Sequence, residues 1–304
     1  MSSATDSSYA SLATKLREVS ALEGISGLLG WDEMVMLPSE SSSCRGEQKA
    51  ALAGVIYDKK TDAALGALLS TLSEEKGGEG LNEVQKAVIR DAAKSYKRET
   101  CLPRELATRI AELETEGYNA WIEARSKADF SIFAPVLQEW LDISLKKAEL
   151  VDPEAPAYDV LLDSFEKGMT GARLDEIFAE VRAGLVPLLS EVRSKGTPPD
   201  TSLLKGKFNP AQQAMLCESI ALDLGFDLSR GRLDVSVHPF TGGTHPTDVR
   251  MTTRFKEEDI TEGLTGAIHE TGHSLYEQVR LRSCLFCVSL SFLFLSFPFG
   301  LFLF

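Results

Sequence analysis

Apolar residues recur at helical spacing over most of this chain, and this pattern constrains its fold more than any other feature. In residues 9–29, leucine, valine and isoleucine return every three or four positions, so that they share one face of a helix. Strict alternation of apolar and polar residues is almost absent before residue 232, and we therefore predict a mainly α fold. The same spacing predicts further helices over residues 45–57, 62–72, 82–96, 103–122, 130–150, 174–192 and 210–224.

Local signals predict where some of these helices begin and end. The run Gly30-Trp31-Asp32 is expected to end the first helix, before a loop that contains Pro38. Asn82 is suited to cap a helix, and Pro103 to open one, because proline is tolerated in a first turn. Pro187 is expected to kink or end its helix, since it has no amide hydrogen to donate.

The apolar period changes to two between residues 232 and 253. Residues 233–237 and 248–253 each alternate apolar and polar side chains, as half-buried strands do. The residues between them, 240–246, are rich in glycine and threonine, which is typical of a turn. We therefore expect a small antiparallel β-sheet with two short strands, placed directly before the next helix.

Composition and charge limit the classes of protein to which this chain can belong. Of its 304 residues, 43% are hydrophobic and 25% are charged, which fits a globular protein with a sizeable core. A formal net charge of -13 argues against nucleic-acid binding. The five cysteines are scattered and odd in number, so no disulfide framework is expected. Residues 1–8 are serine-rich without a secretory pattern, and we expect a disordered tail on a cytoplasmic protein.

The run His269-Glu270-Thr271-Gly272-His273 lies in a segment, residues 261–279, that has helical spacing. Two histidines four positions apart lie one above the other on a helix, so both imidazoles can bind one zinc ion. Glu270 between them is then suited to act as the general base on a zinc-bound water. The motif predicts a metal centre with His269 and His273 as ligands.

The same helix is expected to turn one apolar side toward the core. Thr261 is its expected N-cap. Gly272 costs about 1 kcal/mol in mid-helix relative to alanine, which favours a place where substrate or backbone approaches closely. The expected buried stripe consists of Leu264, Ile268, Leu275 and Val279.

The third metal ligand is not evident from the residues. A catalytic zinc ion normally takes three protein ligands and keeps a fourth position open. Glu277 is the last acidic residue of the chain, and it follows His269 by about 12 Å along a helix axis. It is therefore too far away to bind the same ion as both histidines, and nothing singles out another acidic residue.

Three residues upstream of this helix are further candidates for the site. His238 ends a predicted strand, where it can bind substrate, orient a ligand or serve as a hydrogen-bonded structural residue. Asp248 and Arg250 point to the same face of the next strand. Arg250 can hold a substrate carboxylate through two hydrogen bonds, or it can form an ion pair with Asp248. His245 is expected to be a loop residue.

Four motifs, taken in this order, resemble the carboxypeptidase Taq family of zinc metallocarboxypeptidases. One such motif would be weak, but the ordered set is specific, and the resemblance covers most of residues 9–278. The motifs are Gly30-Trp31-Asp32 with Pro38 and Arg45, His238-Pro239-Phe240, Asp248-Val249-Arg250-Met251-Thr252, and His269-Glu270-Thr271-Gly272-His273 followed by Ser274-Leu275-Tyr276-Glu277-Gln278.

The resemblance implies a mainly α, two-lobed metallopeptidase fold of the neurolysin type with a deep central groove. It implies a carboxypeptidase that releases single residues from peptide C-termini, with zinc or cobalt as the metal and a homodimer as the assembly. By motif position, His269 and His273 would be metal ligands and Glu270 the catalytic general base. His238, Asp248 and Arg250 would line or brace the groove beside them.

The chain departs from the family pattern after Gln278. In the family the third ligand is a glutamate on a later helix, followed by motifs that bind the substrate carboxylate, and this sequence contains neither. The expected division is a disordered start at 1–8, the N-terminal part of a catalytic domain at 9–278, and a hydrophobic segment outside the family pattern at 279–304. We therefore expect a fold that is incomplete at the C-terminus and a carboxypeptidase that is inactive or impaired.

The last segment of the chain has two interpretations. Residues 283–304 carry no charge and are numerous enough to span a bilayer. Pro298 and Gly300 interrupt the run, which favours a truncated gene product over a membrane anchor. The alternative function is a non-catalytic helical fragment that acts as a partner subunit or is held at a membrane by this segment.

Overall fold

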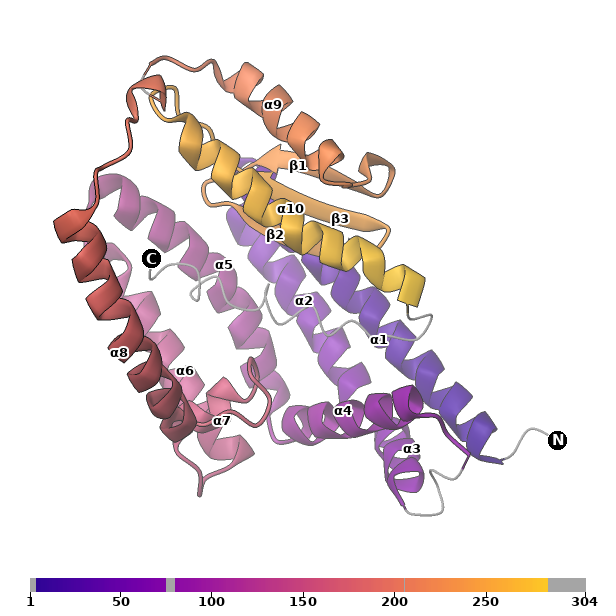
Figure 1. Ribbon diagram of the computed structural model, residues 1–304. Helices are drawn as coiled ribbons and strands as arrows, with labels where there is room; N and C mark the ends of the chain where they lie inside the picture. The colour runs from indigo at the N-terminus through magenta and orange to yellow at the C-terminus, as the bar shows by residue number, and fades with distance from the viewer. Residues whose placement is uncertain (1–3, 75–79, 205, 284–304) are drawn as a thin grey trace.

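The computed structural model describes residues 4–74, 80–204 and 206–283 (Figure 1). Within these ranges the chain is mainly α-helical with one small sheet, as the sequence predicted, and no helix there is long and apolar enough to cross a membrane. The α-helices are α1 (Ala4–Val35), α2 (Ser42–Lys60), α3 (Ala63–Ser73), α4 (Glu83–Thr100), α5 (Arg104–Lys127), α6 (Ala134–Val151), α7 (Ala157–Leu162), α8 (Gly171–Lys195), α9 (Pro210–Asp223) and α10 (Ile260–Ser283).

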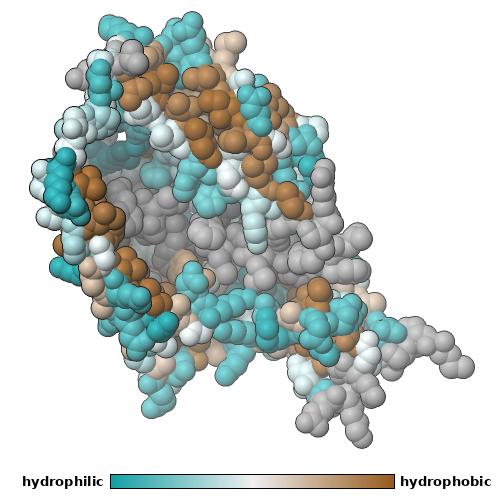
Figure 2. Space-filling model, in the orientation of Figure 1, coloured by the Kyte–Doolittle hydropathy of each residue, from teal (hydrophilic) through white to brown (hydrophobic). Residues whose placement is uncertain are grey.

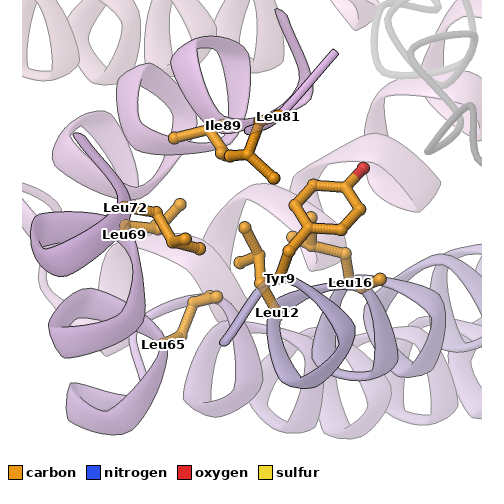
Figure 3. Close-up of a cluster of buried hydrophobic side chains, with 9 residues drawn as sticks. Tyr9, Leu12, Leu16, Leu65, Leu69, Leu72, Leu81 and Ile89 are labelled. Atoms are coloured by element: carbon orange, nitrogen blue, oxygen red, sulfur yellow. The ribbon is translucent and has the colours of Figure 1, made fainter. Parts of the chain in front are cut away.

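A hydrophobic core joins the first half of α1 to α3 and α4 (Figure 3). Leu12 on α1 is fully buried, and Leu65 and Leu69 on α3 are almost so. Ile89 closes the cluster from α4. The apolar faces predicted for these helices therefore meet one another, and the burial of their side chains fixes α1 against α3 and α4.

The predicted helix boundaries are confirmed at some points and wrong at others. Asn82 caps α4 in a capping box with Gln85, in which both hydrogen bonds are 2.9 Å long. Pro103 is the N-cap residue of α5 and directly precedes its first helical residue. Pro187 does not end α8, which continues on both sides of it, and a kink at this position stays a prediction. One backbone hydrogen bond is missing there, because proline has no amide hydrogen to donate.

α1 is longer than predicted at both ends. It begins at Ala4, so residues 4–8, expected to be disordered, are helical. It also continues through Gly30-Trp31-Asp32, where the amides of Met36 and Leu37 donate to the carbonyl of Asp32 at 2.8 Å. Tertiary contacts explain the extension, because Trp31 is buried and the Asp32 carboxylate lies 2.7 Å from Nη2 of Arg45 on α2.

The sheet is mixed, which corrects the antiparallel pairing expected from the sequence. Its strands are β1 (Gly231–Val235), β2 (Phe240–His245) and β3 (Asp248–Thr253), in the order β1-β3-β2. β3 is central and pairs with β1 in parallel and with β2 in the antiparallel sense. The segment expected to be a turn is therefore a strand.

α1 packs closely against the backbone of β2. The two elements lie side by side, and a Cβ added to Gly24 would stand 2.5 Å from the carbonyl oxygen of Thr244. The small residue on α1 therefore lets the helix approach the strand. The residues of β2 that resembled a turn form a strand because they pair with β3, and a Cβ added to Gly243 would meet nothing within 4 Å.

α8 lies at the edge of the molecule (Figure 1). Its large apolar side chains are mostly exposed. Figure 2 shows hydrophobic residues along this helix and again over α9 and α10. The exposed apolar residues of α8 are Phe178, Val181, Leu185, Val186, Leu188, Leu189 and Val192.

Candidate metal centre

The helix that carries the two histidines, α10, lies across β2 and β3 and beside α9. Its buried face is small and polar, and the predicted apolar stripe is only partly buried. Ile268 and Val279 are 43% and 54% exposed, while Leu264 and Leu275 are half-buried. Small side chains let a helix approach a sheet closely, so packing shape outweighs hydrophobicity here. The buried residues are Gly263, Ala267, Glu270, Thr271, Ser274 and Gln278.

α10 begins at a cap supplied by Asp259, which corrects the prediction that Thr261 is the N-cap. The carboxylate of Asp259 accepts hydrogen bonds from the Thr261 hydroxyl, the Thr261 amide at 2.9 Å and the Glu262 amide at 3.4 Å. These bonds, led by that of the Thr261 hydroxyl, lower the pKa of Asp259. Glu262 also forms ion pairs with Arg254 and Lys256, so the start of α10 is fixed to the end of β3.

His269 and His273 lie together on the exposed face of α10. Their Nε2 atoms are 3.2 Å apart, and their ring centroids are 4.8 Å apart. Two nitrogens bound at about 2.0–2.1 Å to one tetrahedral zinc ion would be roughly 3.3 Å from each other. The two imidazoles therefore fit a shared metal ion as this helix already presents them.

The described residues offer this pair and no larger donor cluster. Across residues 4–74, 80–204 and 206–283, no group of three or more His, Cys, Asp or Glu side chains could hold a metal ion. The Cys284-x-x-Cys287 spacing lies outside the described residues. Gly272, between the histidines, faces open space, because a Cβ added there would meet nothing within 4 Å.

Glu270 points away from solvent toward the sheet, and it is only 6% exposed. Its carboxylate oxygen Oε2 accepts a hydrogen bond of 2.6 Å from the hydroxyl of Thr241 on β2. The same hydroxyl lies 3.0 Å from the Glu270 carbonyl oxygen. Thr241 was missed in the sequence because it belongs to the segment interpreted as a turn, and because no local pattern connects it to a helix so far along the chain.

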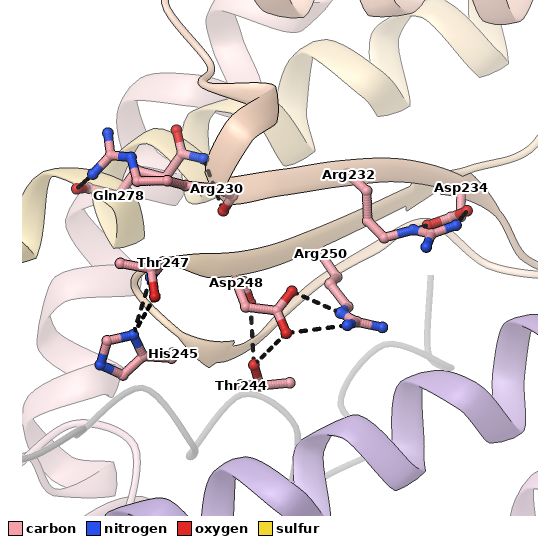
Figure 4. Close-up of polar contacts among 9 residues, drawn as sticks. All are labelled: Arg230, Arg232, Asp234, Thr244, His245, Thr247, Asp248, Arg250 and Gln278. Carbon is pink, nitrogen blue, oxygen red and sulfur yellow. Dashed lines mark hydrogen bonds and ion pairs between the residues drawn. The ribbon is translucent and has the colours of Figure 1, made fainter.

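Arg250 and Asp248 form the ion pair that was one of the two interpretations open from the sequence (Figure 4). Nε and Nη2 of Arg250 lie 2.9 and 3.0 Å from the two carboxylate oxygens of Asp248, and Thr244 donates to one of them at 2.7 Å. Burial alone would raise the pKa of Asp248, but the hydrogen bonds from Arg250 and Thr244 outweigh it, and the pKa is lowered. A role for either residue toward substrate stays a prediction.

Trp31 on α1 lies against two arginines of the sheet. The guanidinium carbons of Arg250 and Arg232 are 4.3 and 5.0 Å from the centroid of its ring. Arg232 is itself paired with Asp234 at 2.6 and 2.7 Å, and Figure 4 shows this pair at the far end of the sheet from His245. These cation–π contacts join α1 to β1 and β3. No local pattern singled out Arg232, because its aromatic partner, Trp31, is distant along the chain.

The other two histidines make local contacts. His238 is half-buried, and its Nδ1 lies 2.7 Å from the carbonyl oxygen of the next residue, Pro239. This contact agrees with the interpretation of His238 as a hydrogen-bonded structural residue. A role for His238 in substrate binding or in orienting a metal ligand stays a prediction. His245 was expected in a loop but ends β2, where it is exposed and contacts Thr247 at 2.7 Å.

The fold and the motif helix define a mainly helical protein with a candidate metal site, and comparison with known proteins gives its family. The chain belongs to the carboxypeptidase Taq (M32) metallopeptidase family, whose family model matches residues 11–291. It is 34% identical over 288 residues to thermostable carboxypeptidase 1 of Thermus thermophilus, a match that covers 90% of this chain and 55% of the relative. It is 33% identical over 263 residues to carboxypeptidase 1 of Bacillus subtilis, covering 86% of this chain and 52% of the relative.

Solved structures show the same relationship. The chain superposes on the M32 carboxypeptidase of Deinococcus radiodurans with a TM-score of 0.77 and 35% identity, covering 90% of this chain and 54% of that one. For metallocarboxypeptidase 1 of Trypanosoma cruzi, the TM-score is 0.73 and the identity 34%, with 90% and 55% covered. The chain therefore spans about half the length of the relatives that it matches. The predicted family and fold class are confirmed.

Proposed function

We propose that this chain carries part of the active site of a metal-dependent carboxypeptidase that releases C-terminal amino acids from peptides. The observation that carries this proposal is the separation of 3.2 Å between the Nε2 atoms of His269 and His273 on the exposed face of α10. The names of the relatives, which are carboxypeptidases, support the same reaction class. Within this proposal, residues 9–278 are the N-terminal part of the catalytic domain.

His269 and His273 would hold the metal, and the family implies a divalent ion. We propose zinc, with cobalt as the alternative, because imidazole nitrogens bind both well. Such an ion would supply a Lewis acid for the peptide carbonyl and would lower the pKa of a water molecule. Glu270 would accept the proton of the attacking water, since it follows His269 directly and is buried against the sheet.

Asp248 and Arg250 would brace the site rather than bind the substrate carboxylate directly. The guanidinium of Arg250 already uses two nitrogens on Asp248 and packs over Trp31. A substrate carboxylate would have to displace Asp248 to form the same bidentate pair. We propose that His238, which lies in the segment between β1 and β2 rather than at a strand end as expected, likewise supports this segment through the contact of its ring with the Pro239 carbonyl.

The proposal is tested by measuring metal-dependent release of amino acids. Two imidazoles bind an ion less tightly than three protein ligands, so we expect weak zinc binding and slow release from peptides that have a free C-terminus. The matched control substrate is the same peptide with an amidated C-terminus, from which no release is expected. Release that persists in Glu270→Gln, or that a chelator does not stop, would contradict the assignment.

A second candidate function is a non-catalytic partner subunit, and the exposed apolar face of α8 favours it. Large exposed apolar patches commonly mark protein–protein contacts. Light scattering with size-exclusion chromatography would test this candidate, and also the predicted homodimer. A strictly monomeric chain at all concentrations would count against both. A cytoplasmic location stays a prediction, and the proposed membrane contact falls on residues 283–304, most of which lie outside the described residues.

A further inference from the structure

We propose that Thr241 is a positioning residue that holds one carboxylate oxygen of Glu270, so that the other oxygen remains the proton acceptor. This inference rests on the proposed function, since it assigns a task to a residue that acts through the general base. Thr241 lies on β2 and Glu270 on α10, so the contact joins two elements that are distant in sequence.

The distances decide which acceptor the Thr241 hydroxyl serves. A hydroxyl has one hydrogen to donate, and its oxygen lies 2.6 Å from Oε2 of Glu270 and 3.0 Å from the Glu270 carbonyl oxygen. A hydroxyl bonded to an ionised carboxylate is typically about 2.5–2.7 Å away, shorter than for a neutral acceptor. The hydrogen therefore goes to Oε2, and the carbonyl contact is secondary.

The other oxygen of the carboxylate is left for chemistry. Oε1 of Glu270 accepts no hydrogen bond from any residue in the described part of the chain. A carboxylate that is anchored at one oxygen keeps a single orientation, and a general base must lie within hydrogen-bond reach of the proton that it takes. Thr241 thus restricts Glu270 to one geometry in which only Oε1 is available.

The position of the Thr241 hydroxyl is itself fixed by its surroundings. Thr241 pairs with the fully buried Met251 on β3. The preceding residue, Phe240, is buried, and its amide donates to the Thr252 hydroxyl at 3.0 Å. α1 packs along β2 so closely that Gly24 has no room for a side chain. The hydroxyl is therefore presented by a rigid strand, as a positioning role requires.

A double-mutant cycle tests the bond without using activity. Thr241→Val removes the hydroxyl at nearly constant shape, and we expect it to shift the unfolding equilibrium in urea by roughly tenfold. In a Glu270→Ala background this shift should fall to about twofold, because only the carbonyl contact remains. Equal shifts in both backgrounds would overturn the proposed bond to the carboxylate.

Thr253→Val is the matched control. Thr253 is buried on β3, and its hydroxyl donates to the Gly263 carbonyl of α10 at 2.9 Å, so it makes the same strand-to-helix bond without a carboxylate. We expect its effect on unfolding to be the same with Glu270 or Ala at position 270. If Thr253→Val were coupled to Glu270→Ala as strongly as Thr241→Val is, the coupling would reflect a general loosening of α10. It would then contradict a specific role for Thr241.

Activity and metal binding complete the test on the full chain. With ZnCl2 as the probe, Thr241→Val should bind as wild type does, while kcat falls by about 10- to 100-fold at constant KM and Thr241→Ser restores most of it. An active wild type with an unaffected Thr241→Val would overturn the positioning role alone. A wild type whose slow release of amino acids continues unchanged in Glu270→Gln would overturn the proposed function and the role that rests on it.

Discussion

At the scale of single residues, a largely buried group of charges between α1, α2 and α5 contributes to how the fold responds to pH. Nζ of Lys49 lies 3.0 Å from Glu33 and 3.6 Å from Glu114, so one ammonium is shared by two carboxylates. Burial raises the pKa of Glu114 to about 6; Lys49 opposes this shift, and the charge of Glu33 adds to it. Burial likewise raises the pKa of the neighbouring Tyr118 to about 12.

Glu114 should make the protein less stable as pH rises from about 4.5 to 6. The folded carboxyl keeps its proton over this range while the unfolded one, near its ordinary value of 4.5, loses it. Glu114→Gln removes this titration, so we expect it to raise the free energy of unfolding by up to about 2 kcal/mol at pH 7.5 and by little at pH 4.5. Urea titrations at the two pH values measure this. The exposed Glu105→Gln on the same helix is the control, and an identical effect of Glu114→Gln at both values would contradict the prediction.

Arg250 should matter for stability through its planar guanidinium. Arg250→Lys loses the two-nitrogen contact with Asp248 and the packing over Trp31, and we expect a loss of about 1–2 kcal/mol in the free energy of unfolding. Thermal and urea unfolding measure this, with the exposed Arg90→Lys as the control. Zinc affinity should not change. A large loss of zinc affinity at unchanged stability would place Arg250 in the metal site.

At the scale of elements, α10 shows what a sequence can and cannot predict. The placement of His269 and His273 side by side on one face was predictable, because their spacing is local; the roles of both as ligands and of Glu270 as base stay predictions. The buried face of α10 was not predictable, since Ala267 and Ser274 face the sheet by virtue of their size, while Ile268 faces outward. The periodicity of a sequence shows only where the hydrophobic residues recur. A helix that packs closely on a sheet requires small side chains at the contact, whether or not they are hydrophobic.

Ala267 and Ile268 give a direct test of this orientation. Ala267 is 1% exposed, so Ala267→Leu should overpack the interface with the sheet and lower the free energy of unfolding by about 1–3 kcal/mol. Ile268→Ala, one position further on, should change it by no more than about 0.5 kcal/mol because that side chain faces solvent. Chemical unfolding of both variants measures the two changes in the free energy of unfolding. If Ile268→Ala lowered it more than Ala267→Leu, α10 would have to be rotated relative to the sheet.

The start of α10 gives a second test at this scale. Asp259 caps the helix through three hydrogen bonds, so Asp259→Ala should lower the free energy of unfolding by about 1 kcal/mol. Asp259→Asn keeps an acceptor oxygen and should lose much less. Helix loss followed by circular dichroism during urea unfolding measures the difference. Equal losses in the two variants would argue that charge, rather than the cap bond, is what matters.

Pairing between distant segments limits prediction for the other elements. The boundary of α4 was predictable because the Asn82–Gln85 capping box is contained in four neighbouring residues. The strand order was not, since β1 and β3 are parallel and β2 joins β3 from the other side. Thr241 escaped notice for the same reason, because its importance comes from Glu270 alone. Features set by neighbouring residues were therefore predictable, whereas contacts between residues distant along the chain were not.

At the scale of the whole molecule, α1 connects the helical core to the site. Its first half is buried with α3 and α4, and its second half packs along β2 and stacks Trp31 on the arginines of the sheet. β2 in turn carries Thr241, which holds Glu270 on α10. The motifs that resemble the family at Trp31, Arg250 and Glu270 are thus parts of one continuous set of contacts.

Zinc titration by calorimetry tests whether His269 and His273 form a metal site. We expect one zinc ion from ZnCl2 to bind per chain, with binding lost in His269→Ala and in His273→Ala and retained in Glu270→Gln. His245→Ala, which removes an exposed histidine from β2, should bind as wild type does. Zinc binding that survives removal of both His269 and His273 would contradict a metal site formed by these two residues.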